Sequence, residues 1–442
     1  MKAKKIALGL LAALTLGVPA RAGGLSAGAP ADVTPGLAEG NQRWPAVAAG
    51  KDGYLVAWQD GAMMAGVEKV SIMAARVGAD GKTLDPKGLA ICDAEGLRGY
   101  PSVAFDGTAF LVAWQDYRNG EDWDLYAARV STEGKVLDAG GVAVAAMKGN
   151  QVYPSVGSDG KGTAFIAWSD VRPGFKPELY RIYGAFVRRG KAAGAFEVAK
   201  GEKASLLDPR AAWDGEGYAV VANEGVPGWS PGHSRAYRVS AGGQASPWKL
   251  AGFLAWSYAF GADPAGKRTC VFSSNRFGHG SYHNAYMVNV AQGASTGARH
   301  VLAGLQDTYS PRNDLWAAVA FDGKNFVAVV EQSDLQKRGH HAAPSVWLVA
   351  TRVDPKTAAT LDLPSGPAEG TKVDMRGPTG TPAYKQAVEK GKTQKGLRAA
   401  YEKDVQLRHP ALASAGGGKS LLVYSRHGGV NKFKIHAVVL TE

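Results

Sequence analysis

Between Tyr100 and Ala145 the chain reads YPSVAFDGTAFLVAWQDYRNGEDWDLYAARVSTEGKVLDAGGVAVA. The segments PSVAF, FLVAWQD, LYAARVS and VLDAGGVAVA are apolar or alternating, which predicts four short β-strands. Asp106-Gly107 lies between the first two and supplies the positive φ that a tight hairpin turn requires. The polar segment YRNGEDWD and the turn TEGK separate the others. The stretch therefore predicts one four-stranded antiparallel sheet.

The same unit recurs along most of the chain, at steps of roughly 50–60 residues until a longer last step. Units of this size cannot bury both faces of their sheet alone, so they stack around an axis and close into a ring. We therefore predict an all-β protein, a seven-bladed β-propeller of four-stranded antiparallel blades. The positions equivalent to the Trp of AWQD are Trp58, Trp114, Trp168, Ala222, Phe272, Val330 and Tyr424.

The last unit has only three predicted strands, PALASA, SLLVYSR and KFKIHAVVL. The missing strand is found near the N-terminus, where residues 25–45 match the layout of residues 137–154, including a shared Gly-Asn-Gln. We expect this N-terminal segment to complete the last blade, because it would pair an edge that is otherwise exposed.

The first residues have the features of a signal peptide. MKAKK is basic, IALGLLAALTLGV is apolar, and Ala20-Arg21-Ala22 fits the small-x-small cleavage rule. We expect residues 1–22 to be removed and the product to be periplasmic or extracellular, a monomer, and not membrane-spanning. The propeller is expected over residues 23–442, with blades at about 45–100, 101–153, 154–208, 209–256, 257–315, 316–375 and 409–442 plus 23–44.

Residues 376–408 interrupt the repeat between the sixth and seventh units. This segment is basic and has helix-forming residues after Pro382, so a partly helical insertion is expected. It either covers one mouth of the central channel or is a solvated loop.

Composition narrows the possible partners. The formal net charge is +12, which favours an anionic partner or reflects adaptation of the whole surface. Basic residues are dispersed and the chain is expected to be exported, so nucleic acid is not an expected partner. Cys92 and Cys270 fall in non-adjacent blades, so we predict two buried thiols and no disulfide.

Units of the form AWQDYRNGEDWDLYAARVSTEG resemble the repeats of secreted bacterial β-propellers, and they are similar in outline to TolB-type and sialidase-like repeats. The resemblance implies the propeller fold, on which binding, scaffolding and several chemistries occur. No intact sialidase Asp-box, Ser-x-Asp-x-Gly-x-Thr-Trp, is present, so no sialidase catalytic residue is assigned.

Two sets of side chains are expected near one face of the ring. Asp and Arg recur after the second strands, as in Asp116 with Arg118 and Asp170 with Arg172, and this repetition favours a structural role. Aromatic side chains precede the first strands, where they either stack on sugar rings or wedge blades together. The members of this second set are Trp44, Tyr100, Tyr153, Trp316 and His409.

Histidines gather on the same face, in the loops after the second strands of units four to seven. Neutral imidazoles can bind Zn, Cu or Mn and can exchange protons near neutral pH, although a merely polar loop set is the alternative. No Walker, GxSxG, HExxH or CxxCH motif accompanies them. Binding candidates are His233, His340, His341, Arg426 and His427 with the aromatic set; candidate ligands of a divalent metal ion are His279, His283, His340 and His341; catalytic candidates are His279, Tyr282, His283 and Arg276.

Two functions are consistent with this sequence. The first is a binding or scaffold module for a protein or an anionic glycan. The second is a polysaccharide lyase or another glycan-active enzyme. In the lyase, Arg276 or Arg426 would neutralise a uronate carboxylate and a His or Tyr of unit five would move the proton, with or without a metal.

Overall fold

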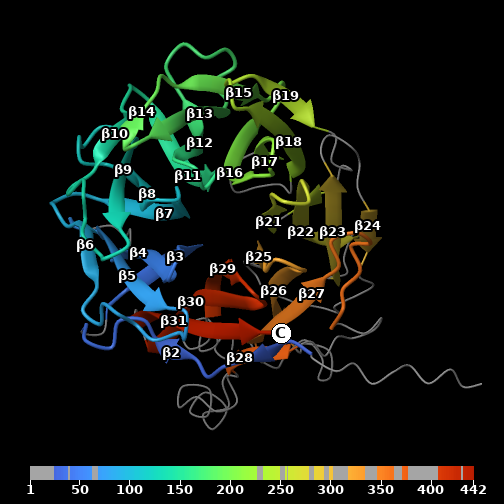
Figure 1. The fold of residues 1–442 in the computed structure, drawn as a ribbon. Coiled ribbons are helices and arrows are strands. Elements are labelled where there is room, and N and C mark those ends of the chain that lie inside the picture. The colour runs from blue at the N-terminus through green and yellow to red at the C-terminus, as the bar shows by residue number, and fades with distance from the viewer. Residues whose placement is uncertain are drawn as a thin grey trace, which may run out of the picture.

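The structure is a computed structural model that describes residues 24–37, 40–61, 68–225, 232–248, 254–255, 257–277, 283–292, 298–301, 317–333, 346–362, 371–376, 407–429 and 432–442. Its regular structure within these residues is entirely β-strand, arranged as seven sheets around a central axis (Figure 1). The predicted seven-bladed propeller is thus confirmed. No helix suited to crossing a membrane occurs in the described part of the chain.

Each blade is an antiparallel meander whose first strand lies nearest the axis (Figure 1). Blade 1 has β3 (Gln42–Ala49), β4 (Gly53–Asp60), β5 (Ser71–Gly78) and β6 (Leu89–Cys92); blade 2 has β7 (Arg98–Phe105), β8 (Ala109–Asp116), β9 (Asp124–Ser131) and β10 (Val142–Ala145); blade 3 has β11 (Asn150–Ser158), β12 (Thr163–Val171), β13 (Arg181–Arg188), β14 (Lys191–Ala192) and β15 (Phe196–Lys200); blade 4 has β16 (Ser205–Trp213), β17 (Gly217–Gly225), β18 (Gly232–Ser240), β19 (Ala245–Trp248) and β20 (Leu254–Ala255).

The second half of the ring repeats the pattern. Blade 5 has β21 (Ser257–Asp263), β22 (Arg268–Phe277), β23 (His283–Gln292) and β24 (Ala298–Val301); blade 6 has β25 (Ala317–Phe321), β26 (Phe326–Ser333), β27 (Val346–Val353) and β28 (Thr371–Arg376); blade 7 has β29 (Leu407–Gly416), β30 (Lys419–Gly429) and β31 (Lys432–Thr441), completed by β1 (Ser26–Ala27) and β2 (Ala31–Asp32).

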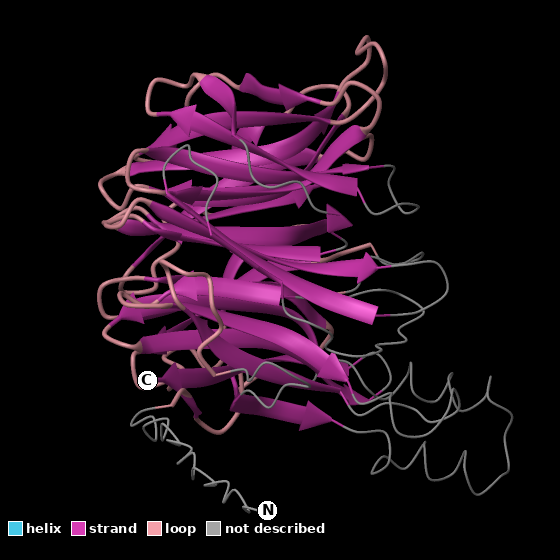
Figure 2. Cartoon of the chain, turned by 90° about the vertical axis from the view of Figure 1, so that its right-hand side faces the viewer, coloured by secondary structure: helices cyan, strands magenta, loops and turns pink. Residues whose placement is uncertain are grey.

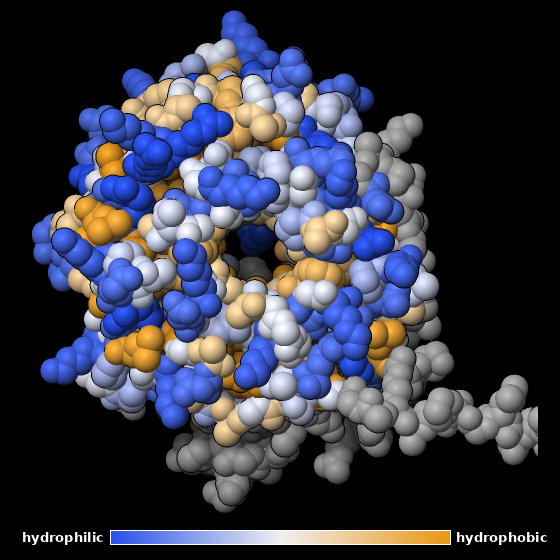
Figure 3. Space-filling view, viewed as in Figure 1, coloured by the Kyte–Doolittle hydropathy of each residue, from blue (hydrophilic) through white to orange (hydrophobic). Residues whose placement is uncertain are grey.

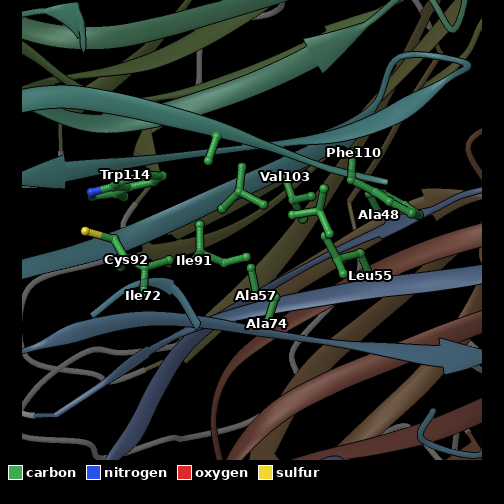
Figure 4. Close-up of a cluster of buried hydrophobic side chains, with 13 residues drawn as sticks. Ala48, Leu55, Ala57, Ile72, Ala74, Ile91, Cys92, Val103, Phe110 and Trp114 are labelled. Carbon is green, nitrogen blue, oxygen red and sulfur yellow. The ribbon is translucent and has the colours of Figure 1, made fainter. Parts of the chain in front are cut away.

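The hydrophobic core is divided among the interfaces between adjacent blades. At the interface of blades 1 and 2, Leu55 and Ile72 pack against Phe110 and Trp114 (Figure 4). The second strands are nearly continuous apolar runs because both of their faces are covered, and every residue of β8 is buried. The residue types that repeat in the sequence are therefore those that each blade buries against its neighbours.

Ring closure occurs as the sequence predicts. Both β1 and β2 pair antiparallel with β31, with Ser26 opposite Thr441 and Ala31 opposite Ala437. The N-terminal segment therefore supplies the outer edge of blade 7, and the C-terminal strand lies inside it (Figure 1).

The turns of the repeat also agree with the sequence, whereas one strand differs in length from the prediction. Gly107 has φ of 98°, and a Cβ there would collide with the carbonyl oxygen of Gly160 in the next blade. The fourth strand of blade 2 is shorter than predicted and covers only β10. The interruption falls at Asp138, whose carboxylate binds the Arg129 guanidinium at 2.7 and 2.8 Å and whose carbonyl oxygen accepts the Gly141 N–H in a turn before β10.

The strands run across the thickness of the disc (Figure 2). Because each blade is a meander, the connections between second and third strands and those entering the next blade lie on one face, and the hairpin turns between first and second strands lie on the other. The signal peptide predicted for residues 1–22 lies outside the described residues, as does nearly all of the insertion predicted for residues 376–408.

Candidate functional site

The innermost strands of five blades share one irregularity near their start. In each, a non-glycine residue with positive φ precedes a proline, and the pairing with the second strand shifts register there. Such β-bulges turn a side chain out of the regular alternation, and bulky residues seldom adopt positive φ. The residues are Trp44 (52°), Tyr100 (51°), Tyr153 (55°), Asp208 (51°) and His409 (57°).

Four of these side chains form a continuous row of rings, which we call the aromatic row: His409, Trp44, Tyr100 and Tyr153. The ring centroids of His409 and Trp44 are 3.6 Å apart and stacked, those of Trp44 and Tyr100 are 4.4 Å apart, and those of Tyr100 and Tyr153 are 5.0 Å apart and edge to face. The row crosses four consecutive blades, 7, 1, 2 and 3. His409 is buried, whereas the other three side chains remain partly exposed.

The row belongs to the strands that surround the central channel, which opens along the axis (Figure 3). Its residues lie near the start of these strands, and therefore toward the face where each blade is entered. The aromatic residues predicted as either a sugar platform or a wedge thus contact one another across blade boundaries and also retain exposed surface.

A polar group continues the row in blade 4. Asp208 occupies the bulge position there, and its carboxylate receives two hydrogen bonds from the Arg210 guanidinium, at 2.6 and 3.2 Å. The Asp208 side chain is 38% exposed. Burial, with the charge of Asp208 as a smaller cause, raises the pKa of Tyr153, so the phenol stays protonated at neutral pH. The site therefore combines partly exposed rings with a charged pair at one end.

The bulges at Tyr153 and Asp208 are each held in place by a side chain of the preceding blade. The Gln115 Oε1 atom of β8 accepts a hydrogen bond from the backbone N–H of Tyr153 at 3.1 Å. The Ser169 Oγ atom of β12 accepts one from the backbone N–H of Asp208, also at 3.1 Å. The geometry of the row is thus fixed by contacts between blades as well as within them.

The histidine and arginine candidates are placed only in part. His279, Tyr282, His340, His341 and Trp316 lie outside the described residues. His233, His283 and His427 lie in β18, β23 and β30 and not in the loops predicted for them, because these strands extend further than expected. Arg276 lies in β22, and only the backbone of these four residues is described. Arg426 is opposite Leu407 and Lys434 in the sheet of blade 7, near the bulge that contains His409.

The metal site and the catalytic cluster consequently stay predictions. On the hairpin of blade 5, Phe277 is paired with His283 and Arg276 with Asn284, so the backbones of two candidates lie on adjacent strands. Among the residues that the structure describes, no group of three or more His, Cys, Asp or Glu side chains could hold a metal ion.

Asp208 was not predicted, although the sequence contains a signal for it. The dipeptide Asp208-Pro209 is the blade 4 counterpart of Trp44-Pro45, Tyr100-Pro101, Tyr153-Pro154 and His409-Pro410. Tyr180 was also missed. It lies on the connection after β12, its backbone N–H donates to the Ser205 Oγ atom of blade 4 at 3.1 Å, and burial raises its pKa. No local pattern marks Tyr180, because its place depends on how that connection docks on the next blade.

The recurring Asp and Arg residues have the structural role that their repetition favours. The Trp114 Nε1–H group donates to Asp116 at 2.8 Å, and Trp168 donates to Asp170 at the same distance. Arg172 binds Asp170 with two hydrogen bonds and lies over the ring of Tyr183. The two thiols are free and buried, as predicted, and burial raises the pKa of Cys270.

Asp124, at the start of β9, is a buried carboxyl group with an unusual pKa. Burial, together with the negative charges of Asp122 and Asp116, raises the pKa of Asp124 to about 6. The folded protein therefore binds this proton more tightly than the unfolded chain, whose Asp has a pKa of about 3.9. Stability from this group is present below that value and is lost as the pH rises through about 6.

We expect Asp124→Asn to stabilise the protein at pH 7.5 by about 1–2 kcal/mol and to have little effect at pH 4, because the amide never becomes charged. Urea unfolding followed by tryptophan fluorescence at the two pH values measures this. Glu121→Gln, an exposed substitution in the same loop, is the control and should change neither value. Equal effects of Asp124→Asn at both pH values would contradict the assignment.

Comparison with known proteins adds similarity of fold only. No protein-family model matches the chain, and no curated protein matches it. Similar solved structures include a protein of unknown function from Dyadobacter fermentans DSM 18053 (TM-score 0.44, 11% identity, covering 95% of this chain and 99% of that one).

Two others are a subtype N11 neuraminidase-like protein of A/flat-faced bat/Peru/033/2010 (H18N11) (TM-score 0.45, 11% identity, covering 76% and 96%) and the α-L-arabinofuranosidase Arb93A from Fusarium graminearum (TM-score 0.44, 10% identity, covering 94% and 98%). No residue role is transferred at these identities. The chain's own seven sheets define its class, the seven-bladed β-propellers.

Proposed function

We propose that this protein is an exported β-propeller that binds a glycan at the aromatic row. The observation that supports the proposal is the row itself, four rings in mutual contact on four consecutive inner strands, three of them partly exposed. Five consecutive blades keep a costly backbone conformation at this one position, and such conformations gather at binding and active sites.

The chemistry of the site suits a sugar. A pyranose or furanose has C–H groups that pack on an aromatic face and hydroxyl groups that need hydrogen-bond partners. The rings of Trp44, Tyr100 and Tyr153 provide the first kind of surface. The carboxylate of Asp208 and the guanidinium of Arg210 provide the second, next to Tyr153 in the neighbouring blade. Binding sites for small molecules commonly combine apolar walls with a few polar groups in this way.

The net charge of +12 supports an anionic glycan, because a positive surface attracts polyanions. The signal-peptide features of residues 1–22 support export, where extracellular or cell-wall glycans are met. Fractionation of cells that express the full-length chain tests this part, and recovery of the protein only from the cytoplasm would contradict it.

Affinity electrophoresis of a chain that starts at residue 23, through gels containing either a neutral or a uronate-rich polysaccharide, tests the binding. We expect retardation that is strongest with the uronate polymer and that weakens with added salt. Trp44→Ala is expected to weaken binding at least tenfold, which corresponds to about 1.4 kcal/mol.

A matched control is available in the same fold. Trp213 is also a partly exposed tryptophan on an innermost strand, but it lies at the end of β16 that is farthest from Asp208, outside the aromatic row. Trp213→Ala should bind as the wild type does. If no polysaccharide retards the wild-type protein, or if Trp44→Ala and Trp213→Ala behave alike, the aromatic row is not a glycan site.

A further inference from the structure

We infer that Gln115 and Ser169 are positioning residues for this site, so that blades 2 and 3 each set the binding residue of the blade that follows. The inference rests on the proposed glycan binding at the aromatic row and extends it to two residues that a bound glycan would not touch. Both occupy the same place in the repeat, between the Trp and the Asp of the second strand, as Trp114-Gln115-Asp116 and Trp168-Ser169-Asp170.

Both side chains are buried and both make their hydrogen bond across a blade boundary. Gln115 is 4% exposed and bonds the backbone of Tyr153 in blade 3; Ser169 is fully buried and bonds the backbone of Asp208 in blade 4. The two distances are equal, 3.1 Å, although one acceptor is an amide oxygen and the other a hydroxyl. The same task is therefore done by two different side chains at one repeat position.

Gln115 and Ser169 accept hydrogen bonds from backbone N–H groups that lie at the β-bulges, where the strand pairing is interrupted. The register of β11 against β12 shifts between Val152 and Ser155, and that of β16 against β17 shifts between Leu207 and Arg210. Tyr153 and Asp208 lie inside these shifts, where the regular pairing of the two strands is interrupted. An acceptor from the neighbouring blade satisfies the N–H group and so stabilises a backbone conformation that is otherwise unfavourable.

Loss of the acceptor would favour relaxation of the bulge. The side chain of Tyr153 or Asp208 would then leave the position in which it adjoins the rest of the site. Affinity for the glycan should fall for this reason, even though the substituted residue lies behind the site.

The fold contains an almost ideal control for each residue. The Ser102 Oγ atom accepts a hydrogen bond from the Val156 N–H of blade 3 at 3.0 Å, and the Ser155 Oγ atom accepts one from the Ala211 N–H of blade 4 at 2.9 Å. These bonds join the same pairs of blades, and they do not involve the bulged residues. Ser155→Ala and Ser169→Ala therefore delete the same atom from the same blade interface.

The experiment compares Gln115→Met with Ser102→Ala and Ser169→Ala with Ser155→Ala, by affinity for the polysaccharide that the wild type binds and by thermal unfolding. We expect similar losses of Tm within each pair. Affinity should fall about tenfold for Gln115→Met and Ser169→Ala, and less than twofold for the two controls. Ser169→Thr keeps the hydroxyl and should recover most of the affinity. Equal affinities within each pair would overturn the inference while leaving glycan binding intact.

A second measurement does not depend on the ligand. In a crystal structure of Gln115→Met, the φ angle of Tyr153 is expected to leave the left-handed region and its ring to separate from Tyr100. If the wild type binds no glycan, the proposed function fails, and this structure still decides whether Gln115 positions Tyr153. An unchanged Tyr153 would overturn the inference.

Discussion

A chain that lacks residues 1–37 is expected to fold incompletely and to aggregate, because most of the outer edge of β31 is then uncovered. In the intact protein β1 and β2 pair with that edge, and Leu25 and Val33 are buried beside it. Their loss removes about 1.5–3 kcal/mol of burial energy for each side chain. It also leaves a strand of ten residues with unpaired backbone groups, a known template for aggregation.

Lys434 adds a polar clamp to this closure. Its Nζ atom donates to the carbonyl oxygens of Thr34 and Leu37, at 3.0 and 2.9 Å, and lies 3.4 Å from the Asp32 carboxylate. The free energy of unfolding of a folded protein is only about 5–15 kcal/mol, so losing both the clamp and the buried side chains removes a large part of it.

Size-exclusion chromatography and thermal unfolding measure this effect, with a chain that starts at residue 23 as the control. We expect the control to elute as a folded monomer and the shorter chain to elute in the void volume or remain insoluble. Lys434→Met, which removes only the clamp, should lower the Tm without preventing folding. A shorter chain with the Tm of the control would show that the ring does not depend on this closure.

The architecture was predictable because each blade repeats the same local signals. A turn such as Asp106-Gly107 needs no tertiary information, and neither does the apolar run that contains Trp114. The count of three strands in the last unit and the match of residues 25–45 to residues 137–154 then allowed only one closure. Local patterns repeated seven times determine a global arrangement that none of them would determine alone.

The site was predictable only as separate residues. Trp44, Tyr100, Tyr153 and His409 were expected before the first strands, whereas they lie within them, at bulges whose positive φ no composition rule indicates. Their contacts with one another depend on the curvature of the ring and on which inner strands become neighbours.

Asp208 shows the limit of searching by residue type. It occupies the position of the aromatic residues and is followed by the same proline, but a search for rings passes over a carboxylate. A search for an X-Pro dipeptide at this position of the repeat would have found all five, although the residue before a proline ordinarily adopts an extended conformation and not a positive φ.

Asp116→Ala is expected to destabilise the protein by about 3–5 kcal/mol, because it leaves a buried arginine without its counter-charge. Arg98 and Asp116 are both fully buried, and the Arg98 Nε–H group donates to the carboxylate at 2.9 Å. The same carboxylate accepts from Trp114 and Arg118. Burial alone would raise the pKa of Asp116, but hydrogen bonds from Arg118 and Trp114 and the charge of Arg98 outweigh it and lower that pKa.

A lowered pKa in the folded state means that the stability from Asp116 is present above the ordinary pKa of Asp, about 3.9, and is lost as the pH falls below it. The destabilisation caused by Asp116→Ala, measured by urea unfolding, should therefore be largest at neutral pH and smaller near pH 3.

Asp170→Ala in blade 3 is the comparison variant. It removes an equivalent set of hydrogen bonds but leaves no fully buried arginine without a counter-charge. Asp170 has the equivalent bonds from Trp168 and Arg172, but Arg172 is 23% exposed and can be hydrated when its partner is lost. We expect a loss of about 1–2 kcal/mol there. Arg98→Met combined with Asp116→Ala should recover part of the larger loss, because no unpaired charge then remains. Equal effects of the two single substitutions, with no recovery in the double variant, would show that Arg98 does not depend on Asp116.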